Sequence, residues 1–274
     1  MELDGAVVIV TGAARGIGRA IAEAYAARGS RIALVDMLRD QLEATAAEMT
    51  ASGGCVLPVV TDITDAAQVD AMVTTAETRF GPVDILVNNA GTFSAIGPVW
   101  EVDPARWFRD IRTNLYGTFL CCAAVLKGMV PRRKGCIINI ATSGGVSDAH
   151  PYCTSYASSK TGLLRLTEGI AEEAREHGVT VFALAPPTVL TEMTKFILSD
   201  PGGREWRPWF RDIFAEGRDY PPQLVADMAV ALVSGGADAL TGRYFDARRD
   251  LNAILEQTDR ILQEDLLALR IREP

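Results

Sequence analysis

The stretch AVVIVTGAARGIGRAIAEAY, residues 6–25, decides the fold of this chain. It opens with the continuous apolar run of a buried strand and closes with apolar residues at helical spacing. Between these two elements lie three glycines: Gly12, Gly16 and Gly18. In such a unit the first glycine allows a tight turn, the second lets a phosphate approach the backbone, and the third lets the helix lie against the strand. The stretch predicts a pyrophosphate site at the helix N-terminus; a tight turn without a ligand is the alternative.

A second apolar run, residues 31–35, ends at Asp36. An acidic residue at this place accepts hydrogen bonds from the hydroxyls of an adenosine ribose and repels a 2′-phosphate. We therefore expect NAD, with NADP less favoured. Arg15 is the opposing signal, because a base in the glycine turn pairs with a 2′-phosphate; otherwise it is a solvated surface arginine.

Strand and helix patterns alternate along the chain, with small and polar residues after the strands. Asp62 and Ile63, after an expected strand at residues 55–60, are placed to contact an adenine ring. The alternative is that Asp62 or Asp65 only caps the next helix. The strand at residues 85–87 is followed by small and amide-bearing residues that allow close cofactor approach and tie neighbouring loops together. These residues are Asn88, Asn89, Ala90 and Gly91.

The segment YASSK, residues 156–160, opens a further expected helix. Tyr156 and Lys160 are four residues apart, so they share one helix face. A nearby positive charge favours the ionised form of a phenol, which makes Tyr156 a candidate general acid/base. Taken alone, the pattern equally fits an aromatic ring packed beside a lysine stem.

The remaining elements continue the alternation. Strands are expected at residues 136–140, 180–185 and 243–247, and helices at about residues 41–49, 103–132 and 222–234. Within the second of these helices, Asn114 is a mediocre helix former that would ordinarily face solvent.

Two segments fall outside this pattern. Residues 192–219 carry aromatic residues among glycines and arginines. They predict either an apolar, mobile lid over a substrate or an aromatic packing or oligomer surface. Residues 248–274 predict an amphipathic helical extension. His150 and Cys153 are open to two readings, as substrate contacts or as an exposed histidine and a small buried thiol.

Composition limits the class of protein. Of 274 residues, 48 % are hydrophobic and 23 % charged, which fits one globular domain over residues 1–274 because no linker composition interrupts it. The net charge of -8 argues against nucleic-acid binding. The N-terminus lacks the basic region of a signal peptide, and no apolar run reaches membrane-spanning length, so we expect a cytoplasmic protein without a membrane partner. Five scattered cysteines and two histidines predict reduced core thiols and no metal site.

Taken together, the motifs T-G-x-x-x-G-x-G at residues 11–18 and N-N-A-G at residues 88–91, with Ser143, Tyr156 and Lys160, resemble the classical short-chain dehydrogenase/reductase family. The likeness covers about residues 4–245. It implies an α/β fold: a single, doubly wound Rossmann-type domain with about seven parallel strands and helices on both faces.

The resemblance also implies residue roles. Tyr156 would be the general acid/base, Lys160 would lower its pKa and hold the nicotinamide ribose, Ser143 would fix the substrate oxygen, and Asn114 would hold a water on the proton path. The residues implied to contact the cofactor are Gly12, Arg15, Gly16, Ile17, Gly18, Asp36, Asp62, Ile63, Asn89, Ala90, Gly91, Tyr156, Lys160, Val189 and Thr191.

Two departures from the family pattern stand out. Pro187 replaces the usual glycine after the sixth strand, and Asp246 is followed by Ala247 and Arg248 instead of two glycines. Pro187 is expected to affect the backbone near the nicotinamide. The change after Asp246 is expected to affect the subunit contacts. The resemblance implies a homo-oligomer, with a tetramer favoured over a dimer.

We therefore expect an NAD-dependent oxidoreductase that interconverts a secondary alcohol and a ketone by hydride transfer, on a medium-sized, largely apolar substrate. One alternative is an NADP-dependent oxoacyl or carbonyl reductase, which Asp36 opposes. The other is a non-catalytic NAD-binding regulatory protein, which the intact Asn114, Ser143, Tyr156 and Lys160 oppose.

Overall fold

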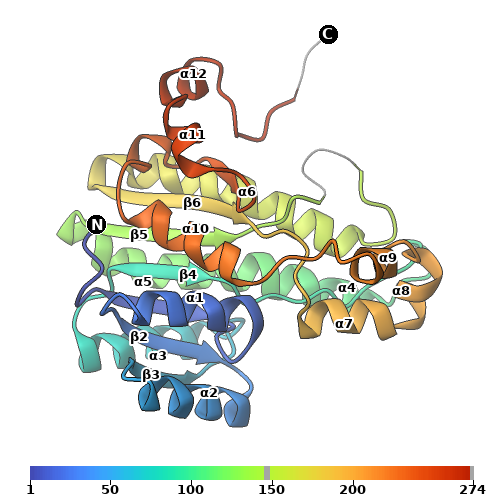
Figure 1. Ribbon diagram of the computed structural model, residues 1–274, viewed down its shortest axis with the longest axis horizontal. Coiled ribbons are helices and arrows are strands. Elements are labelled where there is room, and N and C mark those ends of the chain that lie inside the picture. The colour runs from blue at the N-terminus through green and yellow to red at the C-terminus, as the bar shows by residue number, and fades with distance from the viewer. Residues whose placement is uncertain (145–148, 272–274) are drawn as a thin grey trace.

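A seven-stranded, all-parallel sheet forms the centre of the structure, a computed structural model that describes residues 1–144 and 149–271 (Figure 1). The strand order is β3-β2-β1-β4-β5-β6-β7. The strands are β1 (Val7–Thr11), β2 (Arg31–Asp36), β3 (Cys55–Val60), β4 (Ile85–Asn88), β5 (Gly135–Ile140), β6 (Val179–Ala185) and β7 (Tyr244–Asp246). The expected doubly wound α/β fold is confirmed, and the strand ends differ from the predicted ones by only one or two residues.

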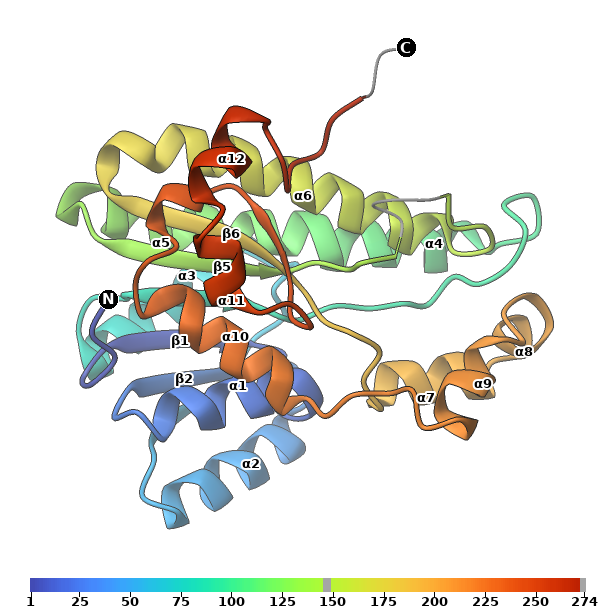
Figure 2. The same ribbon diagram turned by 45° about the horizontal axis from the view of Figure 1, so that its top comes forward.

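Helices cover both faces of the sheet (Figures 1 and 2). Successive residues of β1 point to opposite faces, so Val8 and Val10 pack with one layer and Val7 and Ile9 with the other. The first layer contains α1 (Gly16–Ala26), α2 (Arg39–Ala51) and α10 (Gln223–Val233). The second contains α3 (Ala66–Phe80), α5 (Thr118–Arg132) and α6 (Thr154–Ala174). Burial on both faces explains why the inner strands are continuous apolar runs.

The order of the strands reverses beside β1, which pairs with β2 on one side and β4 on the other. In an open parallel sheet, a crevice forms at the carboxyl ends of two strands whose connections leave in opposite directions. The functional site is therefore expected at the ends of β1 and β4.

The segment expected as one helix over residues 103–132 is continuous but not uniform. It consists of α4 (Pro104–Ile111), a π-helical turn η1 (Arg112–Gly117) and α5. Asp103 caps it by accepting a hydrogen bond from the Ala105 amide. The interpretation of Asn114 as solvent-facing is wrong, because this residue lies in the π turn and is fully buried. Such turns inside α-helices are frequent at functional sites.

By length and mean hydropathy of 1.2, the helical segment over residues 104–132 is apolar enough to cross a membrane, contrary to the expectation that no such segment exists. Of its most apolar window, 44 % is buried inside the protein. Cys121, Cys122 and Met129 pack against the sheet, as in the core helix of a folded domain.

Residues 192–219 fold into three short helices, so the expectation of an irregular segment is wrong. They are α7 (Glu192–Ser199), α8 (Pro201–Trp206) and α9 (Phe210–Ala215). Local capping accounts for the first two, because Thr191 and Thr194 form a capping box at α7 and Asp200 accepts from the Gly202 amide at the start of α8. We call these three helices the lid; they lie at the carboxyl end of the sheet (Figure 2).

The predicted helical extension at the C-terminus forms two short helices, α11 (Leu251–Leu255) and α12 (Thr258–Gln263). Ile254 and Ile261 are buried in the core of the α1 layer. The apolar face of the extension is thus covered by the chain itself. Short 3₁₀ turns, η2 (Arg175–His177) and η3 (Asp238–Leu240), complete the elements.

All five cysteines are free, as predicted. Four are buried, whereas Cys55 is exposed and so is not a core thiol.

Candidate active site

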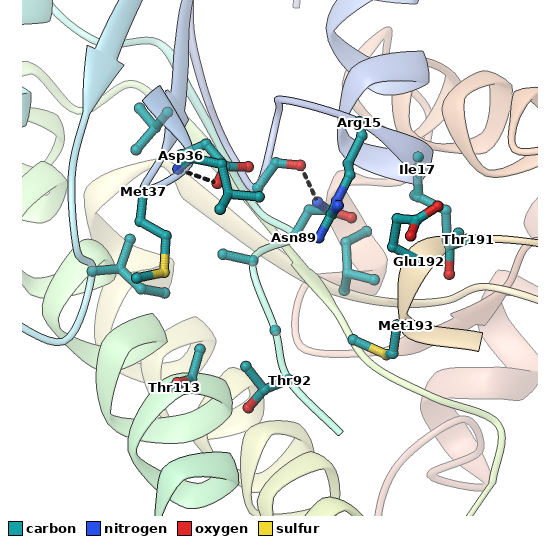
Figure 3. Close-up of a pocket in the computed structure, with 18 of the residues that line it drawn as sticks. Arg15, Ile17, Asp36, Met37, Asn89, Thr92, Thr113, Thr191, Glu192 and Met193 are labelled. Carbon is teal, nitrogen blue, oxygen red and sulfur yellow. Dashed lines mark hydrogen bonds between the residues drawn. The ribbon is translucent and has the colours of Figure 1, made fainter. Parts of the chain in front are cut away.

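A cleft of about 540 Å³ opens at the carboxyl ends of β1 and β4, within the size range of ligand pockets (Figure 3). Most of the residues predicted to contact a cofactor line it. They are Gly12, Arg15, Gly16, Ile17, Asp36, Asp62, Ile63, Asn89, Ala90, Gly91, Tyr156, Lys160 and Thr191.

The glycine turn has the geometry that its sequence predicts. Gly12 and Gly16 adopt positive φ angles of 65° and 58°, which favour glycine. Gly18 does not line the cleft; a Cβ atom there would lie 2.2 Å from the carbonyl oxygen of Gly12. It therefore permits the close contact of helix and strand, and no side chain caps the amides at the start of α1.

Asn89 ties two loops together beside the glycine turn. Its Nδ2 donates to the carbonyl oxygens of Thr11, at 2.9 Å, and Gly12, at 3.1 Å. Its backbone amide donates to Thr11 Oγ1 at 3.0 Å. The predicted tie between the ends of β1 and β4 is confirmed.

Asp36 lies at the end of β2, on the wall of the cleft opposite Thr191, Glu192 and Met193 (Figure 3). One carboxylate oxygen accepts from the Ala14 amide at 3.2 Å and the other from the Leu38 amide at 3.1 Å. These two bonds fix the carboxylate at the rim of the cleft.

Asp65, not Asp62, caps α3, because its side chain accepts from the amides of Ala67 and Gln68. Asp62 accepts from the amide and hydroxyl of Thr64 at 2.9 Å and 2.8 Å. Asp62 therefore remains in the cleft wall with Ile63.

Tyr156 and Lys160 both reach the cleft from the first turns of α6. Lys160 is 4 % exposed, and its Nζ donates to the carbonyl oxygen of Ile140 at 2.6 Å. Burial lowers the pKa of Lys160 from 10.5 to about 8. Burial likewise raises the pKa of Tyr156 from 10.0 to about 12.

A hydroxyl beside the phenol comes from Thr142, where Ser143 was expected. The Thr142 hydroxyl lowers the pKa of Tyr156, against the larger effect of burial. The Gly144 amide donates to Thr142 Oγ1 at 3.1 Å and holds the hydroxyl in place. Thr142 and Ser143 are both half-buried, and neither is among the residues that line the cleft. Adjacent hydroxyl residues in a loop give no sequence signal of which one turns inward.

Asn114 does not line the cleft but lies behind it. Its Nδ2 donates to the Thr92 carbonyl oxygen at 2.9 Å and to Ser159 Oγ at 3.0 Å, while its Oδ1 accepts from the Thr92 amide at 2.7 Å. It thus fixes the loop after β4 against the helix that carries Tyr156.

The two residues predicted at the carboxamide end of the cofactor differ in position. Thr191 lines the cleft and begins α7. Val189 is 3 % exposed and does not line it, because its chain turns inward and pairs with Tyr220. Pro186 lines the cleft, whereas Pro187 is buried behind it.

The prediction missed several residues beside the phenol. Thr92 and Met193 line the cleft, and the ring of Phe93 stacks on Tyr156. Thr92 and Phe93 directly follow the N-N-A-G motif, so their position in the sequence could have indicated that they lie near the cofactor. Met193 lies in residues 192–219, which the sequence marks as a candidate lid without indicating which of them reach the cleft. Within the described residues, no group of three or more His, Cys, Asp or Glu side chains is arranged to hold a metal ion.

Comparison with known proteins decides the family. Residues 6–202 match the profile described as "short chain dehydrogenase". The chain belongs to the short-chain dehydrogenase family. It is accordingly an oxidoreductase of alcohol and ketone groups.

Several relatives of this short-chain dehydrogenase are similar over most of their length. D-threitol dehydrogenase of Mycolicibacterium smegmatis is 37 % identical, with 88 % of this chain and 90 % of that protein covered. Galactitol 2-dehydrogenase (L-tagatose-forming) of Cereibacter sphaeroides is 36 % identical, with 88 % of this chain and 92 % of that protein covered. A solved structure of a single-residue variant of the actinorhodin polyketide ketoreductase with NADPH has a TM-score of 0.79 and 30 % identity, covering 88 % of this chain and 95 % of that one.

The residues of the cleft fit the nicotinamide dinucleotide that this family implies. Backbone with positive φ at Gly12 and Gly16 leaves room for phosphate, and the uncapped amides of α1 are donors for it. Asp36 offers a fixed carboxylate where a ribose would lie, and Tyr156 and Lys160 lie in the same cleft.

Proposed function

We propose that this short-chain dehydrogenase oxidises a secondary alcohol to a ketone, or catalyses the reverse, with NAD as cofactor and Tyr156 as general acid/base. The observation that carries the proposal is that one cleft contains the glycine turn, Asp36, Tyr156 and Lys160.

When bound, a nicotinamide would supply the acceptor or donor of hydride. Tyr156 holds the proton that the substrate oxygen gains or loses, and its Oη must lie within hydrogen-bond reach of that oxygen. The Thr142 hydroxyl lies beside the phenol and lowers its pKa. The buried Lys160 ammonium, held on Ile140, is available to bind ribose hydroxyls and to stabilise negative charge on the phenol.

The preference for NAD rests on Asp36. Its carboxylate is held by two backbone amides and is not paired with an arginine of the described residues, so a 2′-phosphate beside it would meet uncompensated negative charge. Arg15 lines the same cleft and is the residue that would favour NADP. A related ketoreductase has been solved with NADPH. An NADP-dependent reductase is therefore the second candidate function for this chain.

The substrate that we propose is medium-sized and largely apolar. Phe93, Cys153, Phe210 and Ile213 form a buried apolar cluster against which Tyr156 and Met193 pack. The dehydrogenases of threitol and galactitol support a secondary alcohol as the reacting group, and their names indicate more polar substrates.

We also propose that the protein assembles with itself. Phe108, Tyr116 and Phe119 are 60 %, 46 % and 45 % exposed along one helical segment, an unusual cluster for a surface in water. Measurement of the mass in solution tests this point, and a monomer would contradict it.

The test of function is a panel of secondary alcohols, sterols, sugars and terpenoid alcohols, offered with NAD and NADP in parallel and followed by the nicotinamide absorbance. We expect turnover of at least one secondary alcohol, with the higher kcat/KM for NAD. A higher kcat/KM for NADP would favour the reductase. Binding of NADH without turnover of any alcohol would favour a non-catalytic NAD-binding regulatory protein.

A further inference from the structure

Arg207, at the end of α8 in the lid, is a buried cation that forms no ion pair with a carboxylate of the described residues. It is only 7 % exposed. Its Nη1 donates to the Sγ of Cys153 at 3.2 Å, which is a weak acceptor. Its Nε is buried and has no hydrogen-bond partner among the described residues. Within residues 1–144 and 149–271, no carboxylate lies within ion-pair distance of this guanidinium.

The surroundings of Arg207 compensate its charge only in part. The Cζ atom lies 4.8 Å from the ring centre of Trp209, 5.7 Å from that of Phe93 and 5.9 Å from that of Phe210. Ring faces attract a cation, but they do not supply the hydrogen bonds that a desolvated guanidinium has lost. A buried charge with unused donors is the arrangement expected where a ligand supplies the missing acceptor.

The buried carboxylate of Asp110 does not fill this role. Asp110 is fully buried, and its carboxylate already accepts from Thr92 Oγ1, the Ser94 and Ala95 amides, and Ser155 Oγ. Asp200, between α7 and α8, is paired with Arg106 at 3.0 Å. Both carboxylates are therefore committed to other donors.

The unused donors of Arg207 lie along one edge of its guanidinium. Since Nη1 is directed to Cys153, the edge formed by Nε and Nη2 makes no hydrogen bond within the described residues. Two parallel N–H groups on one edge of a guanidinium match the two oxygens of a carboxylate.

Arg207 is not among the residues that line the cleft, but it lies behind the reacting group. Phe93 contacts both partners, since its ring lies 5.7 Å from the Arg207 Cζ and 4.4 Å from the ring of Tyr156. A substrate whose alcohol reaches Tyr156 thus has Arg207 one aromatic ring away.

We propose that Arg207 binds a carboxylate of the substrate, so that the substrates are hydroxy acids or oxo acids whose chain runs along Phe93 from Tyr156 to the lid. This inference rests on the proposed function, which it deepens by naming the substrate class. The competing account is structural: Arg207 only pins the lid to Phe93 and Cys153.

The first test compares each acid with its methyl ester, which removes the charge and keeps the chain. The probes are 3-hydroxybutanoate, 4-hydroxypentanoate and 5-hydroxyhexanoate with NAD, because this series varies the distance between alcohol and carboxylate. We expect at least one acid to exceed its ester in kcat/KM by about 10-fold or more. Esters that equal or exceed their acids throughout would overturn the proposal without any variant.

The second test uses Arg207→Met and, as a control, Arg211→Met, which removes the same charge from an exposed position of α9. We expect Arg207→Met to lower kcat/KM for the preferred acid about 10- to 100-fold, mainly through KM, and to change the ester less than about 3-fold. Arg211→Met should leave both unchanged. Equal losses of kcat/KM on acid and ester would support the structural account, in which Arg207 only holds the lid in place. If Arg207→Met fails to fold, Arg207→Lys replaces it, with a smaller loss expected on the acid alone.

Binding separates this inference from the proposed function. The affinity of the same acids for the protein with NAD is measured by calorimetry, in wild type and in the Arg207 variant. If alcohols are not turned over but acids bind in a way that depends on Arg207, the proposed function fails and this inference stands. If neutral alcohols are oxidised while no acid binds better than its ester, the proposed function stands and this inference fails.

Discussion

The ring of Phe93 lies nearly parallel to the ring of Tyr156, with the centroids 4.4 Å apart and the planes inclined by 11°. Phe93 comes from the loop after β4, and Tyr156 from the first turn of α6. The contact covers one face of the phenol with apolar surface. It therefore belongs to the burial that raises the pKa of Tyr156 to about 12.

Truncation of this ring should affect both stability and ionisation. Phe93→Ala is expected to lower the free energy of unfolding by about 3 kcal/mol, because Phe93 is only 8 % exposed. It should also move the pKa of Tyr156 down from about 12 toward its ordinary value of 10.0, so the pH at which alcohol oxidation reaches its plateau falls. Denaturant unfolding and a pH profile measure the two effects. Trp100→Ala, at an 80 % exposed position, should change neither; an unchanged pH profile in Phe93→Ala would contradict the account.

Close packing at Gly18 should prevent its replacement by a residue with a side chain. Gly18→Ala would place a Cβ 2.2 Å from the Gly12 carbonyl oxygen and 2.4 Å from Asn89 Nδ2, so we expect loss of NADH binding or of the fold. The matched control is Gly169→Ala in α6, where nothing described lies within 4 Å of the added Cβ. This control should raise stability by about 0.5–1 kcal/mol. NADH fluorescence and thermal unfolding measure both; wild-type affinity in Gly18→Ala would refute the assigned role.

Lys160 makes stability depend on pH in a defined direction. Burial lowers its pKa from 10.5 to about 8, so between these values the unfolded chain binds more protons and stability from this group rises with pH. Lys160→Met removes a buried charge, and near pH 7 the variant should be more stable than wild type by about 1–3 kcal/mol. This difference should shrink as the pH rises from about 8 toward 10.

The same measurement on Lys127→Met, an exposed lysine, gives the baseline. The raised pKa of Tyr156 acts in the opposite direction but only above its unfolded value of 10.0, outside this window. A difference between Lys160→Met and wild type that does not vary with pH would show that Lys160 titrates normally in the folded protein.

Asp36 should control the choice of cofactor. Asp36→Ser removes the carboxylate that would accept from a ribose, and we expect kcat/KM for NAD to fall about 10- to 100-fold while the ratio of NADP to NAD rises. Asp40→Ser, an equal charge change at the exposed start of α2, should leave the ratio unchanged. If the ratio of NADP to NAD activity is unchanged in Asp36→Ser, another residue determines the cofactor preference. Arg15 would then be the first residue to test.

Much of the fold could be predicted because its signals are local. The apolar run before Gly12 and the helical spacing after Gly18 define their own elements, and both lie where the sequence places them. The parallel order of strands was implied by the family resemblance and is confirmed.

What could not be predicted depends on contacts between distant segments. The burial of Asn114 arises from a π turn and from hydrogen bonds to Thr92 and Ser159, which no helical spacing reveals. Whether Thr142 or Ser143 faces the phenol depends on how a loop turns. The lid has short capped helices whose apolar residues find their partners only in the folded molecule, such as Ile197 in one cluster with Phe93.

The most direct test of the account is the Tyr156→Phe variant, assayed with the best alcohol from the panel and NAD. The ring and its stacking on Phe93 are kept, so only the hydroxyl is removed. The account predicts that kcat falls by about 10²- to 10⁴-fold while NADH binds with unchanged affinity. Turnover of Tyr156→Phe at the wild-type rate, with NADH bound equally well, would contradict the assignment of Tyr156 as the group that moves the proton.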